Sequence, residues 1–231
     1  MKRILVTGLH GYIGQSFCTY LKQFPQDYLA EPISLRGTDW KSADFSPYDV
    51  VVHAAGLAHQ KETAENAPQY DAVNRALTVE LAQLAKEAGV RQFVFLSSMS
   101  VYGMDEGVIT TDTVPHPKSY YGQSKLEAEQ QLLAMQSETF HVCILRPPMV
   151  YGDGCKGNYQ MLVKLAKLLP VCPDYRNQRS MISIDRLCWE LKARIDRDSS
   201  GIFCPQNPDY VCTCQMIQQI AAAQGKRLPL T

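Results

Sequence analysis

Two features of proteins that bind nucleic acid or membranes are missing from this sequence: an excess of charge of one sign and a long hydrophobic run. The 231 residues include 23 Lys and Arg and 23 Asp and Glu, so the formal net charge is zero. A chain without a strong positive field has no long-range attraction for nucleic acid or an anionic membrane. The apolar run near the N-terminus, Ile4-Leu5-Val6, is far shorter than a signal peptide's apolar segment or the ~20 residues of a membrane span. We therefore expect no nucleic-acid partner and no membrane partner.

Cysteine is frequent but lacks the spacing of a metal site. The eight cysteines are scattered, none forms a Cys-x-x-Cys pair, and the five histidines do not lie at zinc spacing from them. Cys212 and Cys214 stand two residues apart, and buried thiols are the simplest interpretation of this pair. The sequence predicts no metal. Reduced thiols and the lack of a targeting segment lead us to expect a cytoplasmic protein.

Short apolar runs alternate with longer amphipathic stretches along most of the chain. The runs are nearly continuous, which is typical of parallel strands buried on both faces, and the longer stretches carry apolar residues at helical spacing. The expected strands cover residues 4–6, 30–35, 50–52, 93–96 and 142–145, and the expected helices cover residues 12–24, 67–88 and 121–136. Strands that alternate with helices predict an α/β fold with a Rossmann-type, doubly wound parallel sheet.

A glycine-rich segment, Thr7-Gly8-Leu9-His10-Gly11-Tyr12-Ile13-Gly14, joins the first expected strand to the first expected helix. Such a turn directs free backbone N–H groups and the positive end of the helix dipole at one point, which suits a pyrophosphate. Gly8 permits the tight turn, Gly11 leaves room for the phosphate, and Gly14 lets the helix pack close to the sheet. The segment therefore predicts a dinucleotide site.

The end of the second strand usually decides between NAD and NADP, because a carboxylate there binds the ribose 2′-hydroxyl of NAD. Here the expected strand ends at Ser34-Leu35-Arg36, without a carboxylate. A guanidinium can form a bidentate pair with a 2′-phosphate, so Arg36 favours NADP. The alternative is a solvated Arg36 with Asp39 beside the ribose, which would favour NAD.

Tyr121 and Lys125 lie four residues apart, and therefore on one face of an expected helix. A tyrosine has an ordinary pKa of about 10, and a nearby ammonium group together with an oxidised nicotinamide would lower it. Taken alone, the pair is better explained as part of an amphipathic helix. However, Ser97-Ser98 and His53-Ala54-Ala55-Gly56 each follow an expected strand. Both segments should therefore lie at the carboxyl edge of the sheet, where ligands bind.

The motifs and their order along the chain resemble those of the extended short-chain dehydrogenases/reductases, the NAD(P)-dependent epimerase/dehydratase family of nucleotide-sugar enzymes. The resemblance covers nearly the whole chain. The matching segments are residues 7–14, 53–56, 73–74, 97–103 and 146–152, with the pair Tyr121 and Lys125. Residues 146–158 and 177–180 further resemble bacterial polysaccharide enzymes that act as 4-epimerases or 4-keto reductases on UDP-N-acetylhexosamines and their 6-deoxy relatives.

The resemblance implies four catalytic residues. Tyr121 would be the acid/base, and Lys125 would bind the nicotinamide ribose and lower the pKa of the tyrosine. Ser98 would hydrogen-bond the reacting oxygen. Asn74 would fix the active-site backbone or a water molecule.

The expected cofactor site combines the glycine-rich segment, the strand ends and positions implied by the resemblance. It comprises Gly8, His10, Gly11, Tyr12, Ile13, Gly14, Arg36, Asp44, Phe45, Ala54, Ala55, Gly56, Ser97, Tyr121, Lys125 and Pro148. Within this set, Asp44 and Phe45 match positions beside the adenine, and Pro148 matches one beside the nicotinamide.

The expected substrate site comprises Ser98, Asn158 and Arg179. Asn158 and Arg179 match positions that face the diphosphate of a sugar nucleotide, and a guanidinium can bind two phosphate oxygens. The alternative for Arg179 is a surface charge beside Arg176.

Two departures from the family's pattern limit what the resemblance implies. The dehydratases carry an acidic pair directly after the Ser/Thr position, where this chain has Met99 and Ser100, so elimination of water lacks an acid and a base. Family members also usually continue for several dozen residues beyond the position of Thr231. We expect an NAD(P)-binding Rossmann domain over residues 1–150 and a small, shortened, partial substrate-binding region over residues 151–231, with segments that return to the sheet.

The expected function is hydride transfer between a nicotinamide cofactor and C4 of a UDP-sugar, with Tyr121 as the acid/base. The residues do not separate a 4-epimerase from a 4-keto reductase, although Arg36 favours the reductase because cells keep NADP reduced. A cofactor-binding sensor or assembly subunit without turnover is the alternative, and the intact Tyr121 and Lys125 argue against it. The resemblance also implies a homodimer, built by the helices that contain Asn74 and Lys125.

Overall fold

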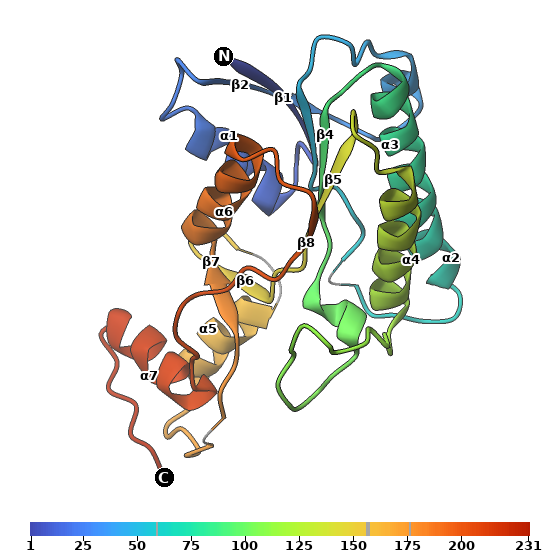
Figure 1. Ribbon diagram of the computed structural model, residues 1–231. Helices are drawn as coiled ribbons and strands as arrows, with labels where there is room; N and C mark the ends of the chain where they lie inside the picture. The colour runs from blue at the N-terminus through green and yellow to red at the C-terminus, as the bar shows by residue number, and fades with distance from the viewer. Residues whose placement is uncertain (59, 156–157, 176) are drawn as a thin grey trace.

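A six-stranded parallel sheet forms the centre of the protein in this computed structural model, which describes residues 1–58, 60–155, 158–175 and 177–231 (Figure 1). The strands lie in the order β2-β1-β3-β4-β5-β8. Their bounds are β1 (Lys2–Thr7), β2 (Tyr28–Ile33), β3 (Val50–His53), β4 (Gln92–Leu96), β5 (His141–Leu145) and β8 (Gly201–Phe203). The predicted doubly wound α/β fold is thereby confirmed.

Helices cover both faces of this sheet (Figure 1). One face carries α1 (Tyr12–Leu21) and α6 (Ile184–Asp196), and the other carries α3 (Leu77–Glu87) and α4 (Tyr120–Met135). Alternation along β1 explains the two cores, because successive side chains of a strand point to opposite faces. Ile4 and Val6 pack in the core with α1 and α6, whereas Leu5 packs in the core with α3 and α4.

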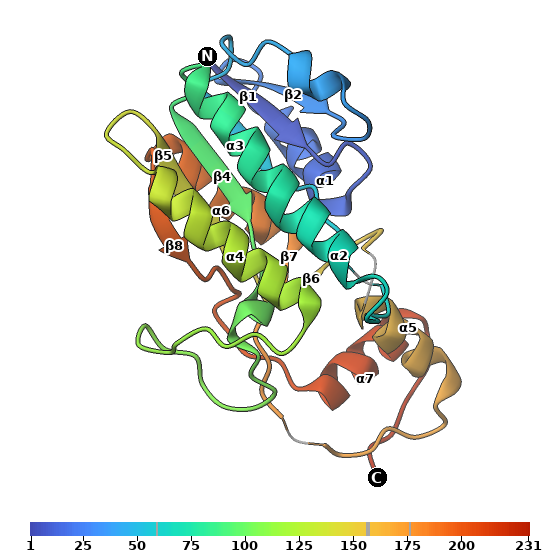
Figure 2. The same ribbon diagram turned by 90° about the vertical axis from the view of Figure 1, so that its right-hand side faces the viewer.

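The rest of the chain extends beyond the carboxyl ends of the main strands (Figures 1 and 2). A second, two-stranded parallel sheet pairs β6 (Met149–Tyr151) with β7 (Met181–Ser183). The helices α5 (Asn158–Leu168) and α7 (Thr213–Ala223) pack on each other around a small third core that includes Ala166, Cys172 and Cys214. Between them in sequence, α6 and β8 return to the main sheet.

Several boundaries differ from the sequence predictions. The single helix predicted over residues 67–88 is a series of α2 (Ala67–Tyr70), a π-helical segment η2 (Asp71–Ala76) and α3. β2 starts and ends two residues earlier than predicted, because its register runs from Lys2 opposite Tyr28 to Thr7 opposite Ile33. The short 3-10 helices η1 (Asp39–Ser42) and η3 (Met99–Tyr102), and the strand β6, were not predicted. Within the described residues, no helix combines the length and apolar character needed to cross a membrane.

Candidate active site at the carboxyl edge of the sheet

The ends of three central strands bring the predicted segments together. Thr7 pairs with His53, and His53 pairs with Phe95. The glycine-rich segment after β1, the Ala54-Ala55-Gly56 segment after β3 and the serines after β4 therefore lie at one edge. This is the edge at which ligands bind in open α/β sheets.

The glycine-rich loop is shaped by close backbone contacts. Gly8 has φ +85°, in the left-handed region that favours glycine, and a Cβ there would lie 3.1 Å from the carbonyl carbon of Ala54 and the nitrogen of Ala55. A Cβ at Gly14 would lie 2.9 Å from the carbonyl oxygens of Thr7 and Gly8. The first and third glycines are thus required by the packing of the loop on β3 and of α1 on the turn.

The N-terminus of α1 has the properties of an anion site. Within the described part of the chain, its N-cap residue Gly11 contributes no side-chain cap, and its first turn contains no acidic residue. The helix itself therefore supplies no anionic side chain to its first N–H groups and the positive end of its dipole. A phosphate group would supply that charge.

His53 connects the glycine-rich loop to the helix that carries Asn74. Its Nδ1 lies 2.8 Å from Oγ1 of Thr7, and its Nε2 lies 2.9 Å from Oγ1 of Thr78. Because Thr78 donates its hydroxyl to the carbonyl of Asn74 (2.8 Å), it accepts from Nε2–H, which leaves Nδ1 to accept from Thr7. Burial, and secondarily Lys125, lowers the pKa of His53 to about 3, so this connection is neutral at working pH.

Lys125 is 3% exposed and lies beneath the edge of the sheet. Its Nζ donates to the carbonyl of Leu96 (2.9 Å) and lies 4.5 Å from the ring centroid of Phe95 and 6.0 Å from that of Tyr121. Burial lowers its pKa to about 7, although the carboxylate of Glu129 acts in the opposite direction. The predicted Tyr–Lys pair is therefore brought together on one face of α4.

Tyr121 lies in the first turn of α4 and packs edge-on against Tyr70, with ring centroids 6.5 Å apart. Burial raises its pKa to about 12, against the lowering effect of a hydrogen bond with Ser98. The expected acidification requires an oxidised nicotinamide as well as the lysine, so it stays a prediction for the cofactor-bound protein.

Asn74 holds the loop after β3. It lies in the π-helical segment η2 and is fully buried. Its Oδ1 accepts from the N–H of Leu57 (2.7 Å), and its Nδ2 donates to the carbonyl of Leu57 (3.0 Å) and to Oγ of Ser124 (3.1 Å). This geometry agrees with the expected role of fixing the active-site backbone.

Ser97 and Ser98 point to different partners. Ser98 is the N-cap of η3, where its Oγ accepts from the N–H of Ser100 (3.1 Å). Ser97 is 4% exposed and donates its hydroxyl to Glu129. Glu129 also forms a buried ion pair with Arg146, whose Nε lies 3.0 and 3.1 Å from the two carboxylate oxygens. The side chain of Ser97 therefore belongs to a polar network below the edge.

Glu62 is a site residue that the sequence predictions missed. Its carboxylate accepts from the backbone N–H groups of Tyr120 (2.7 Å) and Tyr121 (3.2 Å). A carboxylate at a helix N-terminus is stabilising, and here it ties the loop after β3 to the first turn of α4. Ser119 is the N-cap of α4 in the structure, a position that serine favours. Local sequence gives no signal for a carboxylate that lies 58 residues from Tyr120.

The side of the site where the adenine is expected is more exposed to solvent than the side that holds Tyr121 and Lys125. Arg36 is exposed, and its backbone N–H donates to Oγ of Ser34 (3.3 Å). Asp44 accepts from the N–H of Ser46 (2.9 Å), while Phe45 is 3% exposed and packs in the core with α3. A cavity of about 360 Å³ extends from this end of the glycine-rich loop toward β2. Its lining comprises Val6, Gly8, Leu9, Gly14, Gln15, Cys18, Thr19 and Pro32.

The expected substrate residues lie on the C-terminal part of the chain. Arg179 is exposed, and its backbone forms an antiparallel bridge with Val211. Pro148 is half-buried between β5 and β6. The backbone of Asn158 begins α5, whereas its side chain and the whole of Arg176 lie outside the described residues. The structure thus brings Ser98, Tyr121 and Lys125 together, and it places Arg179 on a separate segment.

Comparisons with known proteins identify relatives of this chain. A model described as the NAD dependent epimerase/dehydratase family matches residues 4–169. A UDP-glucose 4-epimerase of Vibrio cholerae is 32% identical, over 97% of this chain and 76% of that protein. A GDP-6-deoxy-D-mannose reductase of Pseudomonas aeruginosa is 31% identical, over 68% of this chain and 55% of that protein. A solved structure of UDP-glucuronic acid 4-epimerase from Bacillus cereus with NAD superposes with a TM-score of 0.83, at 22% identity, over 99% of this chain and 87% of that one.

The parallel sheet, the glycine-rich loop and the Ser–Tyr–Lys arrangement define an extended short-chain dehydrogenase/reductase, a class that uses a nicotinamide cofactor. Within this class, the chain belongs to the NAD-dependent epimerase/dehydratase family, whose model matches most of its length.

Proposed function

We propose that this protein is an NAD(P)-dependent epimerase or reductase that acts at C4 of a UDP-linked sugar. One arrangement carries the proposal: Tyr121 lies beside Ser98, which lowers the pKa of the phenol, and beside Lys125 at the carboxyl edge of the sheet. The similarity to the UDP-glucose 4-epimerase of Vibrio cholerae supports the substrate class.

The residues at this edge fit a nicotinamide dinucleotide. The uncapped N-terminus of α1 would bind the pyrophosphate. A Cβ at Gly56 would lie 3.2 Å from Nζ of Lys125, so the glycine leaves space above the amine. The hydrogen bond to Leu96 uses one of the donors of Lys125, and the others would bind ribose hydroxyls. The bound cofactor would supply hydride transfer to or from C4 of the sugar.

Tyr121 would donate a proton to the reacting oxygen or remove one from it, and Ser98 would orient that oxygen. A tyrosine with a pKa of about 12 holds its proton at neutral pH, which suits proton donation during reduction of a 4-keto group. Removal of a proton from a 4-hydroxyl requires the phenolate, which a positive charge on Lys125 favours. Because the pKa of Lys125 is about 7, we expect protonation of this lysine to assist the oxidative direction.

The diphosphate of the substrate would be bound by the C-terminal part of the chain. Arg179 is exposed, and its backbone is fixed by the bridge to Val211, so its guanidinium would reach into solvent and take two phosphate oxygens. Asn158 is proposed as the second residue at the diphosphate.

An assay with NADPH and a UDP-4-keto-sugar tests the reductase. The expected result is a loss of reduced-nicotinamide absorbance that depends on the keto-sugar, and its absence excludes the reductase. Release of stoichiometric NAD from the denatured protein, with interconversion of two C4 epimers, would instead assign the epimerase.

The choice between NADP and NAD depends on Arg36, which is exposed beyond the end of β2. If it binds the 2′-phosphate, Arg36→Ala weakens NADPH binding about tenfold or more and leaves NADH binding unchanged, since a hydrogen bond to a charged group is worth ~1.5–3 kcal/mol. Equal changes for both cofactors would contradict this assignment and favour Asp39 beside the ribose.

A further inference from the structure

Two cysteines meet at the N-terminus of α7. Cys212 is the N-cap residue and Cys214 lies in the first turn, with their sulfur atoms 3.0 Å apart. Cys214 is 3% exposed, as expected of a buried thiol, but Cys212 is half-buried. The interpretation of this pair as two buried thiols is therefore wrong for Cys212, because the N-cap position brings its sulfur toward solvent.

The two thiols differ in acidity. The hydrogen bond from Cys214, followed by the backbone N–H of Gln215, lowers the pKa of Cys212 to about 7. The same contact raises the pKa of Cys214. In thiol–disulfide exchange, an accessible thiol of low pKa suits the attacking cysteine, and a buried thiol of higher pKa beside it suits the resolving cysteine. Cys212 and Cys214 match these two roles.

The pair lies where α7 contacts residues 173–175 and 177–180. The thiol of Cys212 donates to the carbonyl of Tyr175 (3.3 Å). The next residue, Thr213, exchanges two hydrogen bonds with Asn177, of 2.8 and 2.9 Å. The preceding residue, Val211, exchanges two backbone hydrogen bonds with Arg179. Any change at Cys212 therefore acts on the segment that carries Arg179.

Metal binding is not the favoured chemistry of this pair. Within the residues that the structure describes, no group of three or more His, Cys, Asp and Glu side chains is arranged to hold a metal ion. The two sulfur atoms lie 3.0 Å apart, about 1 Å from the ~2.05 Å of a disulfide bond.

We propose that Cys212 and Cys214 form a redox-active dithiol that reacts with low-molecular-weight disulfides. The thiolate of Cys212 attacks one sulfur of the small disulfide, which forms a mixed disulfide and releases the first small thiolate. Cys214, as its thiolate, then attacks the sulfur of Cys212, which forms the Cys212–Cys214 bond and releases the second. The two protein thiols are oxidised, the small disulfide is reduced to two thiols, and the two protons pass to these thiols.

Oxidation would also affect substrate binding, a consequence that rests on the proposed function. The disulfide removes the hydrogen of Cys212 that is donated to Tyr175 and so loosens the loop of Arg179. We expect KM for the UDP-sugar to rise about twofold to tenfold, the effect of losing one hydrogen bond. Binding of the dinucleotide at the far end of the site should not change.

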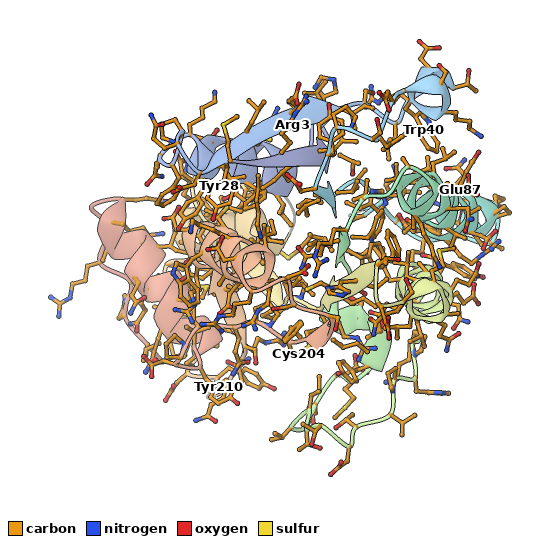
Figure 3. The ribbon with its side chains drawn as sticks, turned by 45° about the horizontal axis from the view of Figure 1, so that its top comes forward. Arg3, Tyr28, Trp40, Glu87, Cys204 and Tyr210 are labelled. Carbon is orange, nitrogen blue, oxygen red and sulfur yellow. The ribbon has the colours of Figure 1, made fainter. Side chains whose placement is uncertain are left out.

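Intact-mass spectrometry after treatment with oxidised glutathione at neutral pH tests the dithiol. The wild-type protein should lose two hydrogens without retaining glutathione, and peptide mapping should find Cys212 joined to Cys214. Cys214→Ser should stop at the mixed disulfide on Cys212, and Cys212→Ser should not react at this pair. Cys204→Ser is the matched control, because Cys204 is exposed and lies at the end of β8, away from α7 (Figure 3).

The possible outcomes separate the two parts of the proposal. An unreactive Cys212 in the wild-type protein, or a disulfide that joins Cys172 to either partner, overturns the dithiol. A Cys212–Cys214 disulfide that leaves KM unchanged overturns the coupling to the loop of Arg179. A disulfide that forms in a protein without turnover leaves the dithiol in place and contradicts the proposed function instead.

Discussion

Lys125 makes the stability of the protein depend on pH. Its pKa is about 7 in the folded protein, against an ordinary 10.5. Between these values the unfolded chain binds more protons than the folded one, so the free energy of unfolding rises with pH across this window and is flat below it. The penalty for burying the charged amine is thus fully present below pH 7 and disappears by about pH 10.5.

Comparison of the wild type with Lys125→Met isolates this effect, because all other titrating groups are shared. We expect the variant to be more stable at pH 7 and its advantage to shrink steadily toward pH 10. Urea midpoints of the cofactor-free proteins at unit pH intervals provide the measurement. An advantage that does not change with pH would contradict the burial of a charged Lys125.

The buried pair of Glu129 and Arg146 gives a second prediction. Their side chains are only 1% and 6% exposed, and removal of one partner of a buried pair leaves an uncompensated charge. Glu129→Gln should therefore cost about 3–5 kcal/mol of unfolding free energy.

The matched control for Glu129→Gln is Asp105→Asn, which breaks a pair with Lys118 whose side chains are 84% and 62% exposed. This substitution should cost less than about 1 kcal/mol. Equal costs in urea unfolding would show that Glu129 is not held in a desolvated network.

Residues whose roles follow from local spacing were predictable at this scale. Tyr121 and Lys125 lie on one face because they are four residues apart in a helix. Glu62 was not predictable, because its contact with the N-terminus of α4 joins segments far apart in sequence. Burial of Tyr121, which spacing does not reveal, raises its pKa to about 12 in the cofactor-free protein, and its acidification by Lys125 and an oxidised nicotinamide stays a prediction.

At the scale of elements, the hydrophobic pattern located β1 to β5 of the main sheet, and tertiary pairing set the ends of β2. β2 matches β1 residue for residue, so its bounds follow from its partner rather than from its own composition. The π-helical turn that divides the helix predicted at 67–88 leaves no mark on apolar periodicity. It lies at Asn74, whose side chain binds Leu57 and Ser124.

Gly152 fixes the junction between the small sheet and the Rossmann part. It has φ +150°, and a Cβ there would lie 2.7 Å from Oη of Tyr12 and 2.6 Å from Cγ2 of Ile184. Gly152→Ala should destabilise the protein by ~1–3 kcal/mol, since the side chains of Tyr12 and Ile184 must shift to make room for the added methyl group.

Gly154→Ala separates packing from backbone strain. Gly154 has φ +72° and open space around it. Gly154→Ala should therefore lower the free energy of unfolding only by the cost of placing alanine in the left-handed conformation, roughly 1 kcal/mol. A larger loss of thermal stability in the control than in Gly152→Ala would contradict the steric account.

At the scale of the whole molecule, the helices α2, α3 and α4 present one continuous face (Figure 2). A cavity of about 400 Å³ lies on this face. Its lining comprises Arg75, Ala76, Val79, Glu80, Gln83, Leu84 and Met135. The lining residues belong to or adjoin the helices that contain Asn74 and Lys125. We therefore keep the prediction that a second copy of the chain docks on this face.

Val79→Glu should therefore shift a dimer to monomers in sedimentation velocity at micromolar concentration, because it buries a charge in the interface. Val108→Glu is the matched control: Val108 is 75% exposed in the loop before α4, and the dimer should persist. A wild type that sediments as a monomer would contradict the homodimer.

Transfer of deuterium from C4 of a labelled UDP-hexose to the nicotinamide tests the central claim most directly, because an epimerase and a reductase working in reverse both make this transfer. The probes are UDP-glucose and UDP-N-acetylglucosamine labelled at C4, mixed with stoichiometric protein and oxidised cofactor. The mass of the reduced cofactor is measured after a rapid alkaline quench, because an epimerase returns the deuterium to the sugar at the end of each turnover. Wild-type protein should return labelled cofactor. Tyr121→Phe should bind the dinucleotide normally but label it ~10²–10⁴-fold more slowly, the usual contribution of a general acid/base. Unlabelled cofactor from the wild type, or equal rates in the two proteins, would contradict hydride chemistry at C4 with Tyr121 as the acid/base.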